Sequence, residues 1–354
     1  MKKTLVFKVN PENPEAKTIC EAAIIIRNGG LVAFPTETVY GLGADALNAK
    51  AVLALFKAKK RPLDNPPIVH VGRFEDVYKL ARDVPAKAKI LMETFWPGPL
   101  TLVLKRSNIV PDVTVAGLDT IAVRMPKHNV ALALIRESGC PIAAPSANLA
   151  GRPSPTTAEH VLEDLNGRID AILDAGPTRI GVESTVLDMT VDPPQILRPG
   201  GTPREALEAA LGKVELHPVA VAEKRLPVEK ARSPGMKHRH YAPKAKLIVV
   251  EGEFSAIVKK VMELVNRYKG QNMKVGVLAT DETASLYRAD VVKSLGSRNR
   301  LDVVARNLFG LLREFDVKGV NIIIAEGVPT EGLGLAVMNR LRKASGYRIV
   351  KASL

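Results

Sequence analysis

The stretch that decides the fold is Leu31-Val32-Ala33-Phe34-Pro35-Thr36-Glu37-Thr38-Val39-Tyr40-Gly41-Leu42-Gly43. Its first four residues are apolar, and a short apolar run of this kind predicts a buried strand. Pro35 ends that strand, because proline has no N–H to donate to a neighbouring strand. Two hydroxyls, a carboxylate and a phenol follow, and the two glycines let the backbone approach a ligand closely. The stretch predicts either a ligand-binding loop at a sheet edge or a tight turn with satisfied hydroxyls.

Two later strands run into polar loops in a similar way. Residues 141–144 lead into Pro145-Ser146-Ala147-Asn148, and the strand predicted at 170–174 is followed by Gly181-Val182-Glu183-Ser184-Thr185. Active sites of α/β sheets gather where strands run into loops. The sequence contains neither a Gly-x4-Gly-Lys-Ser/Thr phosphate loop nor a Gly-x-Ser-x-Gly nucleophile elbow. Hydroxyls at three strand ends therefore predict a ligand site that belongs to neither of those two classes.

Several isolated charged residues allow a functional and a structural interpretation. Lys59 and Arg61 follow a helix that Asn48 can cap, so they are either site residues or partners of the helix dipole. Arg124 lies in the apolar strand predicted at 120–124, and a buried arginine requires a carboxylate from the protein or from a ligand. His70 lies in a predicted strand, where a histidine is more often structural than a ligand.

Composition and length indicate a soluble protein of about two domains. The 354 residues are 46% hydrophobic and 25% charged, and no apolar run approaches the ~18 residues of a membrane span. The N-terminus lacks the apolar stretch of a signal peptide, and two cysteines fit no metal spacing, so a reducing cytoplasm is expected. The net charge of +14 lies mostly beyond residue 211, and it suits either RNA or a small polyanion. The 15 aromatics are not interleaved with the basic residues, which favours the small anion.

A change of pattern divides the chain into three parts. We expect a catalytic α/β domain over 1–211 and a linker over 212–245, which has four prolines and little periodicity. Strands and helices then alternate over 246–354, which predicts a parallel, doubly wound sheet. The linker ends in Lys237-His238-Arg239-His240-Tyr241, a mixture of cations and an aromatic that suits phosphate and a purine. We therefore expect it to act as a lid over the first domain.

Taken in order, the motifs of the chain resemble those of the threonylcarbamoyl-AMP synthases, the YrdC-like family. The resemblance rests on Pro35–Gly43, Lys59-Lys60-Arg61-Pro62, Trp96-Pro97-Gly98-Pro99, Thr120–Pro126, Pro145-Ser146-Ala147-Asn148, Gly181–Thr185 and, for the two-domain form, Ser233-Pro234-Gly235-Met236 onward. It covers essentially the whole chain, and the motifs are specific in combination. It implies a YrdC-like twisted open sheet with flanking helices, followed by a smaller Rossmann-like parallel α/β domain.

The resemblance also implies a reaction. L-threonine and bicarbonate or CO2 would give N-carboxythreonine, whose carboxylate attacks the α-phosphorus of ATP. Pyrophosphate would leave with the assistance of Mg²⁺, for which no ligand set is evident. A tRNA threonylcarbamoyl transferase complex would then use the adenylate to make t6A at position 37 of tRNA. Any direct binding of tRNA by this protein is expected to be weak, and membrane binding is not expected.

By position, the resemblance carries the following site residues over to this chain. Phosphate chemistry falls to Lys59, Arg61, Ser146 and Asn148. Threonine contacts fall to Thr36, His70, Arg124, the backbone of Ala144, and Ser184. ATP contacts fall to Lys59, Arg61, Thr120, Ser146, Ser154, Arg198 and Tyr241. Arg124 would then bind the carboxylate of threonine, and no covalent nucleophile is required.

Two other functions remain as alternatives at this point. The basic charge allows an RNA-binding module that acts on tRNA or double-stranded RNA. The same phosphate cradle would also suit a hydrolase of acyl or carbamoyl phosphates. The reaction products discriminate, since the synthase releases pyrophosphate and the hydrolase releases inorganic phosphate.

Overall fold

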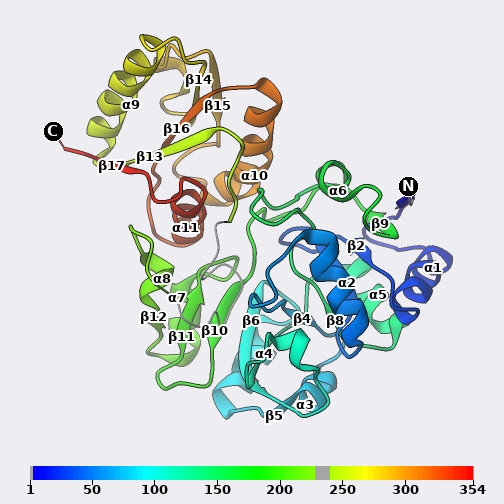
Figure 1. Ribbon diagram of the computed structural model, residues 1–354. Helices are drawn as coiled ribbons and strands as arrows, with labels where there is room; N and C mark the ends of the chain where they lie inside the picture. Colours follow the sequence, from blue (N-terminus) through cyan, green and yellow to red (C-terminus); the bar gives the residue numbers. More distant parts are fainter. Residues whose placement is uncertain (1–2, 228–239, 354) are drawn as a thin grey trace.

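Two β-sheets organise the residues that the computed structural model describes, which are 3–227 and 240–353 (Figure 1). The first sheet has twelve strands in the order β1-β9-β2-β3-β8-β4-β7-β6-β10-β11-β12, with β5 paired to β6, and parallel and antiparallel pairs alternate irregularly along it. Its strands are β1 (Leu5–Lys8), β2 (Val32–Phe34), β3 (Gly41–Asp45), β4 (Val69–His70), β5 (Ala81–Asp83), β6 (Leu100–Arg106), β7 (Thr120–Arg124), β8 (Ile142–Ala143), β9 (Ala171–Asp174), β10 (Thr185–Asp188), β11 (Gln195–Arg198) and β12 (Glu215–Leu216).

Helices cover this sheet on both faces, which explains why central strands such as β2 are buried and apolar throughout. They are α1 (Ala16–Arg27), α2 (Ala49–Lys59), α3 (Val77–Leu80), α4 (Ala86–Phe95), α5 (Asn129–Ser138), α6 (Ala158–Leu165), α7 (Arg204–Leu211) and α8 (Pro218–Val221), with 3₁₀ turns at Phe74–Asp76 and Asp112–Val115. Val32 and Phe34 pack in one core cluster with α1 and α5, whereas Leu31 and Ala33 pack in another with α2 and α6. Successive side chains of a strand point to opposite faces, so each face of β2 buries two residues of the opening stretch.

Local signals account for α1 and α2. Helix α1 buries Ile19, Ala22, Ala23 and Ile26, which recur at the spacing of one helical face. The side chain of Asn48 caps α2 by accepting hydrogen bonds from the amides of residues 50 and 51. The helix ends at Lys59, and Lys60 follows in the left-handed conformation with φ of 53°. The chain therefore turns out of the helix between Lys59 and Arg61, which directs the two side chains differently.

The second sheet is entirely parallel, as the alternating pattern predicts, with the order β15-β14-β16-β13-β17. Its elements are β13 (Lys246–Gly252), α9 (Phe254–Lys269), β14 (Val275–Ala279), β15 (Val291–Ser294), α10 (Leu301–Lys318), β16 (Ile322–Glu326), α11 (Gly334–Ala344) and β17 (Ile349–Ala352). Helix α9 packs on one face, and α10 and α11 pack on the other.

Two details of this domain differ from the sequence prediction. Where the alternating pattern predicts a helix between β14 and β15, the chain forms only a 3₁₀ turn, Ala284–Leu286, and the last strand, β17, was not predicted. The hydroxyl groups of Thr280 and Thr283 donate to the buried carboxylate of Glu326, at 3.1 and 2.8 Å. These side-chain bonds compete with a regular helix in this segment.

Part of the predicted linker belongs to the first sheet. Strand β12 pairs in parallel with β11, and α8 packs against β11 and against α11 of the second domain. The segment lacks helical or strand periodicity because each element is only two to four residues long. Residues 228–239, which include Lys237 and Arg239, lie outside the described residues.

The two domains share one apolar cluster. Val39 and Val182 of the first domain pack with Tyr241 and with residues of α10 and α11. At Gly181, φ is +82°, and a Cβ built there would lie 2.4 Å from Cα of Arg306 on α10. This backbone-to-backbone approach leaves room for glycine only. The loop before β10 is thus pressed against the second domain. Among the described residues, no helix is both long enough and apolar enough to span a bilayer.

Candidate functional site

A cavity lies where the polar loops of the first sheet meet the end of the linker. The residues that line it come from the loop after β2, from β4, β7 and β11, and from the loops flanking α2, β8 and β10. They are Thr36, Thr38, Val39, Gly41, Arg61, Ile68, His70, Arg124, Ala144, Pro145, Ser146, Glu183, Ser184, Arg198, His240 and Tyr241. Nine of the residues that the sequence nominated therefore meet in one place, although up to 205 positions separate them.

Backbone pairing holds the first two loops together. Gly41 forms an isolated antiparallel bridge with Ser146. The amide of Leu42 donates to the carbonyl of Pro145 at 2.8 Å, and the amide of Ala147 donates to the carbonyl of Tyr40 at 2.8 Å. A Cβ at Gly41 would approach the side chain of Ala144 to 3.3 Å. Gly41 thus allows close contact between two loops of the protein.

The residues that were expected to bind the substrate threonine form one wall of the cavity. Both interpretations of the opening loop hold for Thr36, because its hydroxyl closes a turn by donating to the carbonyl of Val39 at 2.7 Å and also lines the cavity. Burial lowers the pKa of His70 to about 3, and the nearby guanidinium of Arg124 lowers it further in the same direction. His70 is therefore a neutral imidazole at physiological pH.

Arg124 has a protein carboxylate as its partner. Its Nη2 lies 2.7 Å from Oε2 of Glu37, and both side chains are buried. The sequence left open whether this carboxylate would come from the protein or from a ligand, and the family resemblance assigned it to threonine. The structure supplies a protein carboxylate, since a buried guanidinium without a bound ligand must be compensated from within the protein, and the contact of Arg124 with threonine stays a prediction. Glu37 was missed as a site residue even though it lies inside the opening stretch.

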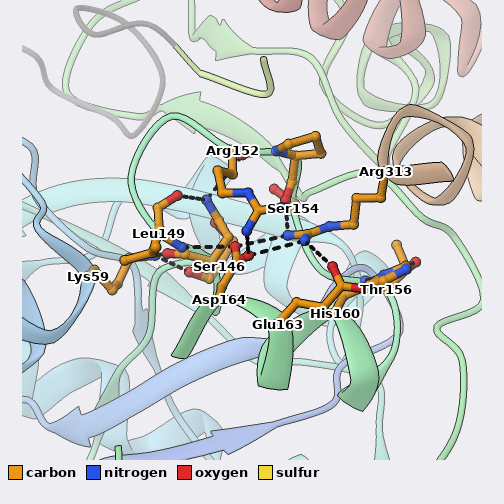
Figure 2. Close-up of polar contacts among 12 residues, drawn as sticks. Lys59, Ser146, Leu149, Arg152, Ser154, Thr156, His160, Glu163, Asp164 and Arg313 are labelled. Carbon is orange, nitrogen blue, oxygen red and sulfur yellow. Dashed lines mark hydrogen bonds and ion pairs between the residues drawn. The ribbon is translucent and has the colours of Figure 1, made fainter. Parts of the chain in front are cut away.

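The nominated phosphate residues divide into two groups. Arg61 and Ser146 line the cavity, whereas Lys59 and Asn148 lie behind its wall. Lys59 is 1% exposed, and its ammonium donates to the carbonyls of Ser146 and Asn148 (Figure 2). Burial lowers the pKa of Lys59 well below its usual value, and the neighbouring Arg61 has the same effect.

Two nominated ATP residues, Thr120 and Ser154, do not line the cavity among the described residues. Thr120 begins β7 and Arg124 ends it, so roughly 13 Å of strand separate them. Ser154 is buried behind the wall, where its hydroxyl donates to Oε1 of Glu183. The sequence did not indicate that these two side chains would miss the cavity, because both residues lie in motifs close to residues that do line it.

The second domain contributes buried cations next to the cavity. Arg340 of α11 pairs with Glu183, with 2.7 Å between Nε and Oε2, and its guanidinium lies 5.2 Å from the ring of Tyr241. Nζ of Lys343, one turn further on, has no hydrogen-bond partner among the described residues. Burial and the nearby Arg340 and Arg198 lower the pKa of Lys343 to about 7. The sequence did not nominate Arg340 or Lys343, because neither lies in one of the motifs on which the family resemblance rests.

Positive charge exceeds negative charge around the cavity. Arg61 donates to the carbonyls of residues 65 and 66, Arg198 donates to the carbonyl and hydroxyl of Ser184, and neither forms an ion pair with a described carboxylate. Burial lowers the pKa of Arg198, although a guanidinium remains charged at neutral pH. Buried cations without carboxylates are costly unless an anion joins them. The arrangement therefore suits a polyanionic ligand beside the wall that carries Arg124.

Within the described residues, no group of three or more His, Cys, Asp or Glu side chains could hold a metal ion. The two cysteines, Cys20 and Cys140, are free thiols.

Comparisons with known proteins agree over both domains. Residues 24–200 match the family described as telomere recombination, which comprises Sua5, YciO and YrdC proteins, and residues 202–346 match the threonylcarbamoyl-AMP synthase C-terminal domain. The threonylcarbamoyl-AMP synthase of Pyrococcus abyssi is 53% identical, with 98% of this chain and 99% of that protein covered. The synthase of Bacillus subtilis is 51% identical over 94% of each chain.

A solved structure gives the same result. The crystal structure of the Pyrococcus abyssi protein complexed with L-threonine superposes with a TM-score of 0.94, at 53% identity, and covers 99% of this chain and 100% of that one. The predicted fold class and the family resemblance are thereby confirmed. The chain belongs to the threonylcarbamoyl-AMP synthase family of enzymes and has both domains of that family.

Proposed function

We propose that the cavity is the active site in which L-threonine, bicarbonate or CO2, and ATP give threonylcarbamoyl-AMP and pyrophosphate. The observation that carries this proposal is the excess of cations, the buried Arg198 and Lys343 and the half-buried Arg61, beside a wall of hydroxyls and an arginine. That combination suits an amino acid at one end and a polyphosphate at the other. The synthase names of the relatives and the bound threonine of the Pyrococcus abyssi structure support it.

Threonine would bind along the wall formed by Thr36, His70, Arg124 and Ser184, together with the backbone of Ala144. The Nη2 of Arg124 forms no hydrogen bond with a described residue, so it retains a donor for the carboxylate of the amino acid. The hydroxyl of Ser184 lies 2.8 Å from that of Thr101, which fixes its orientation. The neutral His70 would contact the substrate without repelling its ammonium group.

ATP would bind with its triphosphate toward Arg61, Arg198 and Ser146, and with its base toward Tyr241. The ammonium of Lys59 has three donors, of which the carbonyls of Ser146 and Asn148 use two, so one remains for a phosphate oxygen. The roles of Thr120 and Ser154 at ATP remain predictions, since neither lines the cavity. The cavity offers water molecules only about 50 Å³, far less than the space of a typical ligand site. We therefore expect the wall at His240 and Tyr241 to move when ATP binds, as a lid would.

The chemistry would use the substrate as its own nucleophile. The carbamate oxygen of N-carboxythreonine forms a bond to the α-phosphorus, and the bond from that phosphorus to the bridging oxygen breaks, which releases pyrophosphate. Lys59 and Arg61 would stabilise the charge that develops on the phosphate oxygens, and Ser146 would orient them. Asn148 would act through Ser146, whose hydroxyl donates to Oδ1 of Asn148 at 2.6 Å.

Mg²⁺ would enter with the nucleotide. Serine hydroxyls on the cavity wall, such as those of Ser146 and Ser184, are oxygen donors of the kind this ion accepts, and phosphate oxygens and water would supply its other ligands. The ion would supply neutralisation of the departing pyrophosphate. We also propose that the protein works in the cytoplasm, where a tRNA threonylcarbamoyl transferase complex consumes the adenylate.

Product analysis tests the proposed function. The protein is incubated with ATP and Mg²⁺, and threonine and bicarbonate are omitted in turn. Pyrophosphate and threonylcarbamoyl-AMP should form only when both are present, and Lys59→Ala or Arg61→Ala should slow that release far more than it weakens threonine binding. Inorganic phosphate in place of pyrophosphate would instead show a hydrolase. Submicromolar binding of tRNA without ATP or threonine would favour an RNA-binding module.

A further inference from the structure

The position of Lys59 depends on one loop, residues 146–154. Its ammonium is bound by two carbonyls of that loop, those of Ser146 and Asn148. No described carboxylate forms an ion pair with Lys59. The direction of its remaining donor is therefore set by the loop, because a buried ammonium keeps the orientation in which its bonds are made. Any shift of the loop moves Lys59 and Ser146 together.

Asp164 of α6 holds this loop from beneath (Figure 2). Its Oδ2 accepts a hydrogen bond from the amide of Leu149 at 3.0 Å, and its Oδ1 pairs with Nη1 of Arg152. The carbonyl of Arg152 in turn accepts from the side-chain amide of Asn148 at 3.1 Å. The Asp164 carboxylate thus ties together Leu149 and Arg152, the two ends of the turn that directly follows Asn148.

The second domain completes the arrangement through Arg313 of α10. The guanidinium of Arg313 is 3% exposed, and its Nη2 and Nη1 lie 3.0 and 3.2 Å from the two oxygens of Asp164. Its Nη2 also donates to the carbonyl of Pro153 in the loop itself, at 2.6 Å. The planar fork of arginine matches a carboxylate in two places, which fixes direction as well as distance. Figure 2 shows Arg313 reaching this network from the side opposite to Lys59.

We propose that Arg313 and Asp164 are positioning residues, through which the second domain sets the geometry of Lys59 and Ser146. The path runs from Arg313 to Asp164, then to the loop, and ends at the ammonium of Lys59. Neither Arg313 nor Asp164 lines the cavity among the described residues, so each acts only through the loop. This inference rests on the proposed function, in which Lys59 and Ser146 act on the triphosphate.

A largely buried ion pair that does not touch the loop would add stability without affecting the rate, and another arginine of the second domain provides the matched control. Arg342 forms a two-pronged pair with Glu251 at 2.8 and 2.9 Å and is 11% exposed, but Glu251 does not contact the loop. Arg313→Met and Arg342→Met therefore remove pairs of similar geometry. Only Arg313→Met is expected to lower kcat.

The experiment uses the full-length protein and the variants Arg313→Met, Arg313→Lys, Asp164→Asn and Arg342→Met. Steady-state pyrophosphate release gives kcat and the KM for ATP, calorimetry gives the Kd for threonine, and a thermal melt gives stability. A small displacement of a catalytic group costs on the order of tenfold to a hundredfold in rate. We expect that loss in kcat for Arg313→Met and Asp164→Asn, a smaller loss for Arg313→Lys, and an unchanged Kd for threonine in all three. Arg342→Met should lose stability and keep its kcat.

A wild-type kcat in folded Arg313→Met would overturn the proposal. If that variant does not fold, a wild-type kcat in both Arg313→Lys and Asp164→Asn would overturn it equally. Lys59→Ala, measured alongside, separates this failure from failure of the proposed function. A wild-type rate in Lys59→Ala would show that the phosphate site itself is wrongly assigned.

Discussion

The guanidinium of Arg124 lies against the carboxylate of Glu37 in the wall of the cavity, with 2.7 Å between Nη2 and Oε2. The Nη1 of Arg124 donates to the hydroxyl of Thr38 at 3.0 Å, and its Nε donates to the carbonyl of Gly98 at 3.2 Å. Neither oxygen of Glu37 forms an oriented hydrogen bond with a described residue, although the charges are in contact. The pair therefore compensates the buried charge and leaves a donor of Arg124 available to a ligand.

Arg124→Lys should weaken threonine binding by roughly tenfold, which corresponds to ~1.4 kcal/mol. Lysine keeps the charge that Glu37 needs but loses the planar fork that bonds Thr38, Gly98 and a ligand carboxylate together. Calorimetric titration with threonine measures the change, and a thermal melt confirms that the variant is folded. An unchanged affinity for threonine in a stable Arg124→Lys protein would mean that the arginine only compensates the charge of Glu37.

Tyr241→Ala should raise the KM for ATP while leaving threonine affinity intact. The ring is 4% exposed, stacks on Phe309 with centroids 5.4 Å apart and lies beneath the guanidinium of Arg340. Its loss removes both the cavity-lining aromatic group that we place near the base and the end of the proposed lid. Tyr241→Phe keeps the stack and serves as the control. Equal KM values for ATP in the alanine variant and the wild type would show that Tyr241 is only part of the domain interface.

Acid should destabilise the protein through His70, and the sign follows from its lowered pKa. Burial and Arg124 hold the pKa of His70 at about 3 in the folded state, whereas it is about 6.5 in the unfolded chain. Between these values the unfolded state binds the proton and the folded state does not, so stability falls as the pH decreases through this window. Thermal melts across that range should show a shallower decline for His70→Asn. Parallel curves for the two proteins would indicate that His70 titrates normally.

Glu183→Gln should destabilise the contact between the domains. Arg340 is fully buried and pairs with Glu183 across that contact. Removing one partner of a buried pair costs about 3–5 kcal/mol, because the remaining charge stays unpaired. Denaturant unfolding measures this loss. The matched change Glu208→Gln, in the exposed pair Arg204–Glu208, should cost less than about 1 kcal/mol. If the two substitutions lowered the free energy of unfolding by similar amounts, another described group would have to compensate the charge of Arg340.

Much of the fold could be predicted because local patterns and burial agree. The apolar run before Pro35 became β2, the cap at Asn48 began α2, and the alternation after residue 246 became a parallel sheet. The part of the predicted linker that forms β12 and α8 could not be found in this way, because elements of two to four residues carry no periodicity. Similarly, the 3₁₀ turn Ala284–Leu286 replaces a predicted helix where threonine hydroxyls bond Glu326, a residue distant in sequence.

The sequence by itself determined the family, the two kinds of sheet and most lining residues, since Thr36, Ser146 and Ser184 each follow a strand or precede one in a recognisable loop. Only the tertiary structure decided where the charges go. It placed Glu37 on Arg124, put Lys59 behind the wall, and brought Arg313 and Arg340 from the second domain to Asp164 and Glu183. A buried charge takes whichever partner the packing brings within about 4 Å. Residues 87 or more positions apart leave no sign of that pairing in the order of the chain.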